Sequence, residues 1–293
     1  MNDVPFCSVI VPTRGRPDQL RDCLESLAQL EHPRERYEVI VVDDGGSLVP
    51  ATYVDAFSER LDLMMLSQRR SGPAAARNAG AAKARGQLLA FTDDDCLPDR
   101  PWLAQLVAAF EENPQTGVGG HTVNSLTDNP YAAASQLVID VGYGHHNVRG
   151  GDARFLTTNN LAVPAAGFRD VGGFDVRFRT SEDRDFCARW VAHGLRLAYV
   201  PDAIVRHAHR LTFGGFIRQN FAYGRGAYLF HREQARRWQT RIRLEPSFYR
   251  ALVRTALRRE RGMRRLQLLA LLGVWQLANA AGFAWESTHR HDD

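Results

Sequence analysis

Three apolar segments in the first hundred residues each end abruptly at polar or charged side chains. The segments are residues 8–11, 38–42 and 87–92. They are followed by Pro12, Thr13 and Arg14, by Asp43 and Asp44, and by Asp93, Asp94 and Asp95, respectively. Continuous apolar runs of this length are typical of strands that are buried on both faces of a sheet. This pattern constrains the fold more than any other feature of the sequence.

Helical patterns separate these predicted strands. Apolar residues spaced three or four apart between Leu20 and Leu30 indicate one buried face of a helix. Pro73 begins an alanine-rich helix that continues to about Arg85. The alternation predicts an α/β fold, with a Rossmann-like, mostly parallel sheet and helices on both faces. Ligands of such sheets bind beyond the carboxyl ends of the strands, so the three polar strand ends should meet at one crevice.

The second half of the chain changes character twice. From Gly117 to about Thr180 it is rich in Gly, Asn and Thr, and residues 142–151 indicate loops. A helix is predicted from about Glu182, followed by a strand at residues 195–200. From Arg232 onward the composition becomes that of arginine-rich helix. We therefore predict one domain over residues 1–230 and a helical appendage over residues 231–293.

The C-terminal appendage is first basic and then apolar. Residues 232–265 contain twelve arginines and three glutamates, although the whole chain has a net charge of only +4. Residues 266–285 are long enough to span a bilayer, but glutamine and asparagine interrupt the run. A helix that lies on a membrane surface or packs on the domain is favoured over a spanning one, and spanning stays an alternative. The arginines have few aromatic neighbours, so nucleic acid is not an expected partner.

Clustered carboxylates at a strand end favour a bound cation, because they otherwise repel one another. Asp93 and Asp95 are spaced to hold a hard divalent metal together with a diphosphate, which fits Mg²⁺ or Mn²⁺. The alternative is a solvated acidic turn in which Asp95 caps a helix. Asp43 and Asp44 are suited to accept hydrogen bonds from a base or a ribose, or they simply form a turn.

A series of short motifs occurs in order along roughly residues 6–215. The motifs are SVIVPTRGR, EVIVVDDGG, GPAAARNAG, AFTDDDC with PxxxWL, GGFD, SEDRDFCARW and VPDAIVRHAH. The ordered set resembles the family 2 glycosyltransferases of GT-A fold. The resemblance implies an inverting, metal-dependent transfer of a sugar from a UDP-, GDP- or dTDP-sugar to a hydroxyl acceptor. Polysaccharide, glycolipid or cell-envelope glycan synthesis is the implied setting, and a lipid-linked acceptor is one option.

The resemblance also implies roles for individual residues. Positions that match the nucleotide-sugar site of the family are Pro12, Thr13, Arg14, Asp43, Asp44, Arg77, Asp93 and Asp94. Asp93 and Asp95 match the DxD motif, with Asp95 as the direct metal ligand, and a late histidine, His207 or His209, completes the metal contacts.

On the acceptor side, the resemblance implies a catalytic base. Glu182 and Asp183 match the ED motif, in which Asp183 is that base, and Arg189 lies further along the same predicted helix. An acid stabilised by the helix dipole is the alternative for Asp183.

The loop after the first predicted strand argues against two other classes of nucleotide-binding enzyme. VPTRGRPD lacks the glycine run expected of a sugar nucleotidyltransferase or a hydride-transferring Rossmann enzyme. The nucleotidyltransferase and a non-catalytic nucleotide-binding relative remain the alternative functions.

The four cysteines are far apart, and three of them have apolar or helical surroundings that favour a reducing compartment. No signal peptide is recognised at the N-terminus. We expect a cytoplasmic protein, in peripheral contact with the inner face of the cell membrane.

Overall fold

The computed structural model describes residues 4–46, 51–147, 152–239 and 245–289, and the chain forms two compact units. The sheet unit comprises Met1–Val123, Asn147–Arg177 and Asp183–Ala208. The helical unit comprises Asn124–His146, Phe178–Glu182 and His209–Asp293.

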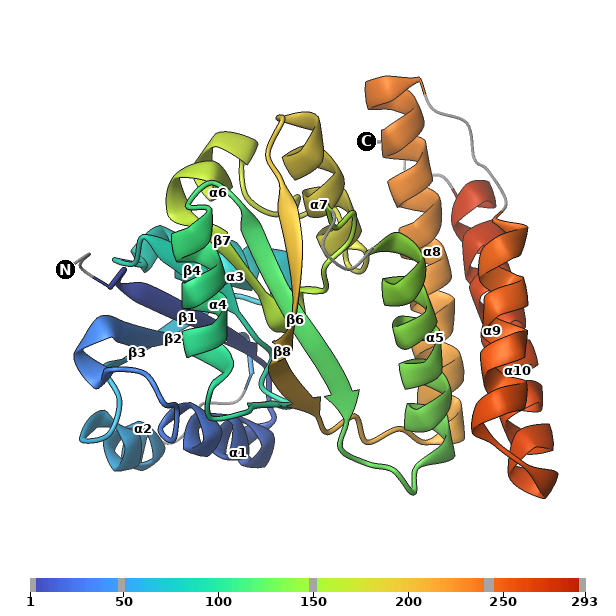
Figure 1. Ribbon diagram of the computed structural model, residues 1–293, viewed down its shortest axis with the longest axis horizontal. Coiled ribbons are helices and arrows are strands. Elements are labelled where there is room, and N and C mark those ends of the chain that lie inside the picture. Colours follow the sequence, from blue (N-terminus) through green and yellow to red (C-terminus); the bar gives the residue numbers. More distant parts are fainter. Residues whose placement is uncertain (1–3, 47–50, 148–151, 240–244, 290–293) are drawn as a thin grey trace. The chain divides into compact units, whose positions relative to one another are not determined.

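The sheet unit is built on one eight-stranded sheet with the order β3-β2-β1-β4-β7-β6-β8-β5 (Figure 1). The strands are β1 Cys7–Thr13, β2 Tyr37–Asp44, β3 Leu63–Gln68, β4 Leu88–Phe91, β5 Cys96–Pro98, β6 Gly117–Asn124, β7 Leu161–Pro164 and β8 Leu197–His207. β3, β2, β1 and β4 are parallel, whereas β7 is antiparallel to β4 and β6, and β5 is antiparallel to β8. The predicted α/β class is confirmed, and the parallel part of the mixed sheet is its N-terminal half.

Helices cover both faces of this sheet. They are α1 Pro17–Leu27, α2 Ala51–Ser58, α3 Pro73–Lys83, α4 Trp102–Glu112, α6 Ala165–Val171 and α7 Glu182–Ala192, with short 3₁₀ turns at Arg34–Arg36 and Thr158–Asn160. Successive side chains of β1 point to opposite faces of the sheet. Val9 packs in the core formed with α1 and α4, whereas a side chain added at Gly80 of α3 would meet Ile10 at 2.6 Å.

The helical unit consists mainly of α5 Pro130–His146, α8 Phe213–Trp238, α9 Pro246–Arg259 and α10 Gly262–Thr288. Buried residues from all four helices form its core, among them Leu137, Phe216, Leu252 and Leu271. The backbones of α8 and α10 lie against each other. A Cβ atom added to Gly224 would fall 2.0 Å from the carbonyl oxygen of Asn279. Glycine is therefore required at this crossing for steric reasons.

One local prediction is wrong. Residues 142–146 are the last turn and a half of α5 and do not form a loop, while residues 148–151 lie outside the described residues. Gly142 and Gly144 weaken the intrinsic preference for helix, but Val141 and Tyr143 are buried, and packing maintains the helix. The predicted domain boundary at residue 230 falls within α8.

Candidate functional site

The polar ends of the first two strands lie side by side at the carboxyl edge of the parallel strands. Thr13 at the end of β1 is in register with Asp43 of β2. The loops after these strands also touch, because a Cβ atom on Gly46 would lie 2.6 Å from the backbone nitrogen of Gly15. Arg14 is exposed in the first of these loops. The β4 end belongs to the same edge, since the amide of Thr92 donates to the carbonyl oxygen of Ile10 at 3.2 Å.

Each of the three consecutive aspartates has a cationic partner. The carboxylate of Asp93 accepts from the Arg77 guanidinium at 2.6 Å. Arg16 bridges the other two, 2.6 Å from Asp94 and 3.0 Å from Asp95. Cations of the protein therefore offset much of the negative charge of this cluster before any ligand binds.

Asp94 differs from its neighbours because its side chain is fully buried. One carboxylate oxygen accepts from the Thr13 hydroxyl at 2.8 Å, and the other contacts Arg16. Burial raises the pKa of Asp94 to about 6, although Arg16 and Thr13 act in the opposite direction. These contacts show Asp94 joining the end of β1 to the acidic segment.

His207 is brought to Asp95 by strand pairing. β5 and β8 are antiparallel with Cys96 opposite His207, and the amide of Ala208 donates to the carbonyl oxygen of Asp95 at 2.9 Å. The imidazole Nε2 of His207 lies 3.3 Å from a carboxylate oxygen of Asp95. Burial alone would lower the pKa of His207, but the Asp95 carboxylate raises it above its usual value.

His209, the other predicted candidate, belongs to the helical unit. Its ring Nε2 lies 3.2 Å from the side-chain amide nitrogen of Gln219. The ring of His207 meets a carboxylate of the acidic cluster.

The donor atoms at Asp95 suit a divalent metal. The ligand atoms of Asp95, Cys96 and His207 all lie within 4.8 Å of one another. Burial raises the pKa of the Cys96 thiol well above its usual value, so this group stays protonated and is a poor ligand. Asp95 and His207 offer carboxylate oxygens and one imidazole nitrogen, donors that suit Mn²⁺ or Mg²⁺. Asp93, the other predicted ligand, is not part of this group and contacts Arg77.

Asp43 and Asp44 have different surroundings at the end of β2. Asp44 accepts from the side chain of Gln68 and from the amides of Ser71 and Gly72, at 2.7, 2.7 and 2.8 Å. Burial would raise the pKa of Asp44, but these hydrogen bonds lower it below its usual value. Asp43 accepts from the amide of Gly46 at 2.9 Å. Asp44 thus secures the turn before α3, which leaves Asp43 better suited to receive a ligand.

The acidic pair Glu182 and Asp183 begins α7. Glu182 is buried, and Asp183 is partly exposed and accepts from the amide of Arg184 at 2.8 Å. The preceding Ser181 has a φ of +69°, a left-handed conformation that is unusual for serine and is often found at functional sites.

Arg189, further along α7, forms hydrogen bonds with other residues of the protein through its whole guanidinium group. Its three guanidinium nitrogens bind Asp185 and the carbonyl oxygens of Val171 and Gly173, at 2.7, 2.8 and 2.7 Å.

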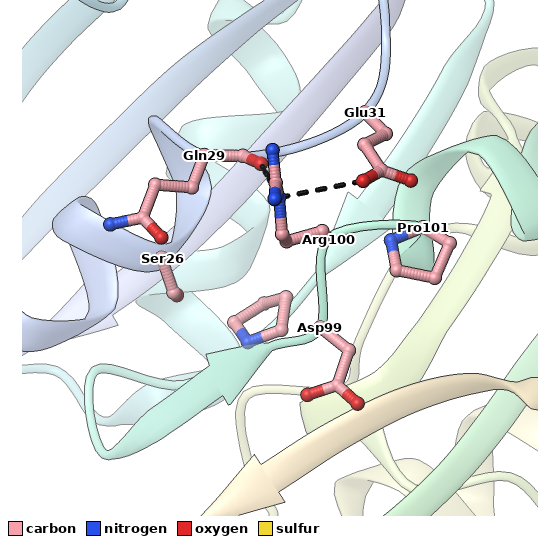
Figure 2. A pocket seen from close by; sticks show the side chains of 7 residues that line it. Ser26, Gln29, Glu31, Asp99, Arg100 and Pro101 are labelled. Carbon is pink, nitrogen blue, oxygen red and sulfur yellow. Dashed lines mark hydrogen bonds and ion pairs between the residues drawn. The ribbon is translucent and has the colours of Figure 1, made fainter.

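Sequence reasoning missed Arg16, whose guanidinium contacts both Asp94 and Asp95. The available signal was its place, two residues after Arg14 in the loop beyond the first strand. A shallow surface hollow elsewhere in the sheet unit is lined by none of the candidate residues (Figure 2). Its walls are Ser26, Gln29, Glu31, Pro98, Asp99, Arg100 and Pro101.

Known proteins resemble this chain in sequence. The family model described as Glycosyl transferase family 2 matches residues 8–171. A pre-mycofactocin glycosyltransferase of Mycobacterium tuberculosis is 33% identical over 226 residues, which is 75% of this chain and 46% of that protein. The glycosyltransferase AglE of Haloferax volcanii is 28% identical over 230 residues, 76% of this chain and 73% of that protein. The chain thus spans about half the length of the mycobacterial relative.

Solved structures share the fold. The mannosyltransferase PcManGT of Pyrobaculum calidifontis, solved with GDP-Man and Mn²⁺, matches with a TM-score of 0.64 and 19% identity, over 98% of this chain and 84% of that one. Residues 1–349 of TarS from S. aureus, solved with UDP-GlcNAc, match with a TM-score of 0.61 and 17% identity, over 96% of this chain and 83% of that one. At these identities the likeness shows the fold alone.

Proposed function

Because the chain belongs to glycosyl transferase family 2, we propose that it transfers a sugar from a nucleotide-diphosphate sugar to a hydroxyl group with inversion at the anomeric carbon. The observation that carries the proposal is the acidic cluster at the carboxyl edge of the parallel strands, where Asp93 and Asp95 lie beside Arg77, Arg16 and His207. Ligands of α/β sheets bind at this edge.

The nucleotide half of the proposed site follows the strand ends. We assign Pro12, Thr13 and Arg14 to the side of the base, and Asp43 to the base or ribose. Arg77 would keep the Asp93 carboxylate oriented toward the ribose and diphosphate. Asp44 and Asp94 would act through the residues they bind, since their oxygens accept hydrogen bonds or ion pairs from the protein.

Asp95, Asp93 and His207 would hold the divalent ion that the donor set fits. When bound, that ion supplies positive charge where the diphosphate leaving group develops negative charge. The protein's own cations near the cluster, Arg16 and Arg77, add to that charge.

On the acceptor side we assign the base to Asp183. An inverting transfer needs a group that takes the hydroxyl proton as the oxygen attacks the anomeric carbon. Asp183 is partly exposed at the start of α7, where a hydroxyl acceptor could reach its carboxylate. Glu182 and Arg189 would shape the acceptor side through α7.

We propose that the donor is a UDP-, GDP- or dTDP-sugar. Two proteins of similar fold were solved with GDP-Man and UDP-GlcNAc.

We infer a transferase domain over residues 1–230 and an attached helical segment over residues 231–293. The acceptors that we propose are of the polysaccharide, glycolipid or cell-envelope class. The four cysteines are buried free thiols, which fits a cytoplasmic location.

A titration calorimetry screen of nucleotide sugars, with and without Mn²⁺, tests this proposal. We expect one donor to bind more tightly with Mn²⁺, and Asp183→Asn to retain that binding while hydrolysis or transfer of the sugar is lost. Undiminished turnover by Asp183→Asn would remove the base from the proposal. Binding without any turnover in the wild type would favour a non-catalytic nucleotide-binding protein. Release of diphosphate from a nucleoside triphosphate and a sugar phosphate would favour a nucleotidyltransferase.

A further inference from the structure

α9 carries an apolar stripe on its exposed side. Tyr249, Val253 and Leu257 are 38%, 48% and 43% exposed, and their spacing of four places them on one face of the helix. Leu252 and Ala256 face the core of the helical unit instead. Three large apolar side chains in a row are thus left in contact with solvent.

α10 continues this pattern along its whole length. Met263, Leu266 and Leu277 are 78%, 61% and 72% exposed. Small residues fill the same face at steps of three and four, namely Ala270, Gly273, Ala280 and Ala284, and all four are exposed. The two helices contact each other within the helical unit, as Figure 1 shows.

Arginines flank the apolar stripe of α9. Arg250, Arg254 and Arg258 each follow one of the three apolar residues, all are exposed, and no ion pair with a described residue involves them. Residues 245–265 contain seven arginines and two glutamates. The exposed stripes of α9 and α10, together with these arginines, are therefore both apolar and strongly basic; we call them the α9–α10 face.

We propose that the α9–α10 face rests on the surface of a membrane that contains anionic lipids, with both helices parallel to the bilayer plane. The apolar stripes would enter the boundary between headgroups and acyl chains, while the arginines extend to the lipid phosphates. Each arginine near an anionic surface contributes about 1 kcal/mol. This inference does not depend on the proposed transfer reaction.

The packing of α10 argues against a spanning helix. α10 is long and apolar enough to cross a bilayer, with a mean hydropathy of 1.4 over its most apolar window, of which 28% is buried. However, it is packed backbone to backbone on α8, where a Cβ atom on Gly282 would lie 2.0 Å from the carbonyl oxygen of Phe221.

The partner helix makes spanning still less favourable. α8 carries Arg218, Arg225 and Arg232 along its length, and Arg225 binds Glu286 of α10. Carrying these charges into hydrocarbon would be costly, whereas a surface position leaves the pair intact.

A second copy of the chain fits this face less well than lipid. Two such faces in contact would bring arginines of one copy against arginines of the other, and like charges repel. An anionic surface is complementary to the same side chains. The charge of the α9–α10 face therefore favours an anionic membrane surface over a second copy of the chain.

Flotation of the full chain with phospholipid vesicles tests the proposal. We expect binding to vesicles of phosphatidylcholine with phosphatidylglycerol, binding to phosphatidylcholine alone that is weaker by at least about a hundredfold, and release by 1 M salt or alkaline carbonate. The triple variant Arg250→Gln, Arg254→Gln, Arg258→Gln should bind about a hundredfold more weakly. Its matched control replaces three exposed arginines of the sheet unit, Arg100, Arg154 and Arg169, by Gln and should bind like the wild type.

The apolar part of the face is tested by a second pair of variants. Val253→Ser with Leu257→Ser should weaken binding to the anionic vesicles at least tenfold, whereas Val176→Ser, at an exposed valine of the sheet unit, should not. Equal binding by the arginine variant and its control would overturn the proposal. Retention on the vesicles in alkaline carbonate would overturn it in favour of a spanning helix. A stable dimer by analytical ultracentrifugation, lost in Leu257→Ser, would overturn it in favour of a second copy.

Discussion

Replacing Arg16 by glutamine removes the cation that Asp94 and Asp95 share. In the structure its guanidinium lies 2.6 Å from one carboxylate and 3.0 Å from the other. A divalent ion that binds the Asp95 oxygen contacted by Arg16 would take the place of this guanidinium. We therefore expect Arg16→Gln to bind Mn²⁺ more tightly than the wild type when no nucleotide is present.

The size of the effect follows from the exposure of Arg16. Its side chain is 44% exposed, so each contact is treated as a partly solvated ion pair worth about 0.2–1 kcal/mol. Two such contacts amount to about 1 kcal/mol, which corresponds to roughly a fivefold gain in Mn²⁺ affinity. The Asp94 carboxylate, no longer paired with a cation, acts in the same direction.

Titration calorimetry with Mn²⁺ at pH 7.5 and low salt measures this difference. Arg14→Gln is the matched control, because it removes the same charge from the same loop and Arg14 forms no ion pair with a described aspartate. An equal gain in Mn²⁺ affinity in both variants would show that the gain comes from the loss of a positive charge at long range and not from the contacts of Arg16. Unchanged or weaker Mn²⁺ binding by Arg16→Gln would refute the displacement, provided that thermal unfolding shows the variant to be folded.

Three further predictions concern the cluster, the turn before α3 and the helical unit. Asp95→Ala should remove the Mn²⁺-dependent part of nucleotide binding, which calorimetry with and without the ion measures; an unchanged titration would contradict metal ligation. The lowered pKa of Asp44 means that its stabilising hydrogen bonds are present above the usual carboxyl pKa of about 3.9 and are lost as the pH falls through the lower folded value. Urea unfolding should therefore show Asp44→Asn to be about 1–3 kcal/mol less stable than the wild type at pH 7, with a smaller difference at pH 3. Gly282→Val should destabilise the helical unit by roughly 1–3 kcal/mol in thermal unfolding. A Cβ atom at Gly273 would meet no atom within 4 Å, so Gly273→Val should lack that steric cost.

Local patterns in the sequence predict the N-terminal half of the sheet because each strand and helix there is marked by its own residues. The meeting of the acidic residues at one edge follows from that pattern, because the carboxyl ends of parallel strands lie at the same edge of the sheet. In the antiparallel half, the only strand that the sequence predicts is residues 195–200, which overlaps the start of β8. β5 has three residues, and its pairing with β8 joins Cys96 to His207 across more than a hundred positions. Only the tertiary structure shows that His207 lies beside Asp95.

The sequence also cannot separate the three aspartates, because neighbouring carboxylates have identical chemistry until their surroundings are known. In the structure Asp94 turns inward to Thr13 and is fully buried, whereas the side chain of Asp93 is 27% exposed beside Arg77. The burial of one carboxylate must be offset by a cation, and Arg16 provides it while also reaching Asp95. The same guanidinium thus stabilises the folded edge of the sheet and neutralises the carboxylate proposed to hold the metal. Under the proposed metal site, an ion that took the Asp95 oxygen contacted by Arg16 would exchange one cation for another, so its affinity would depend on Arg16 as well as on the ligands.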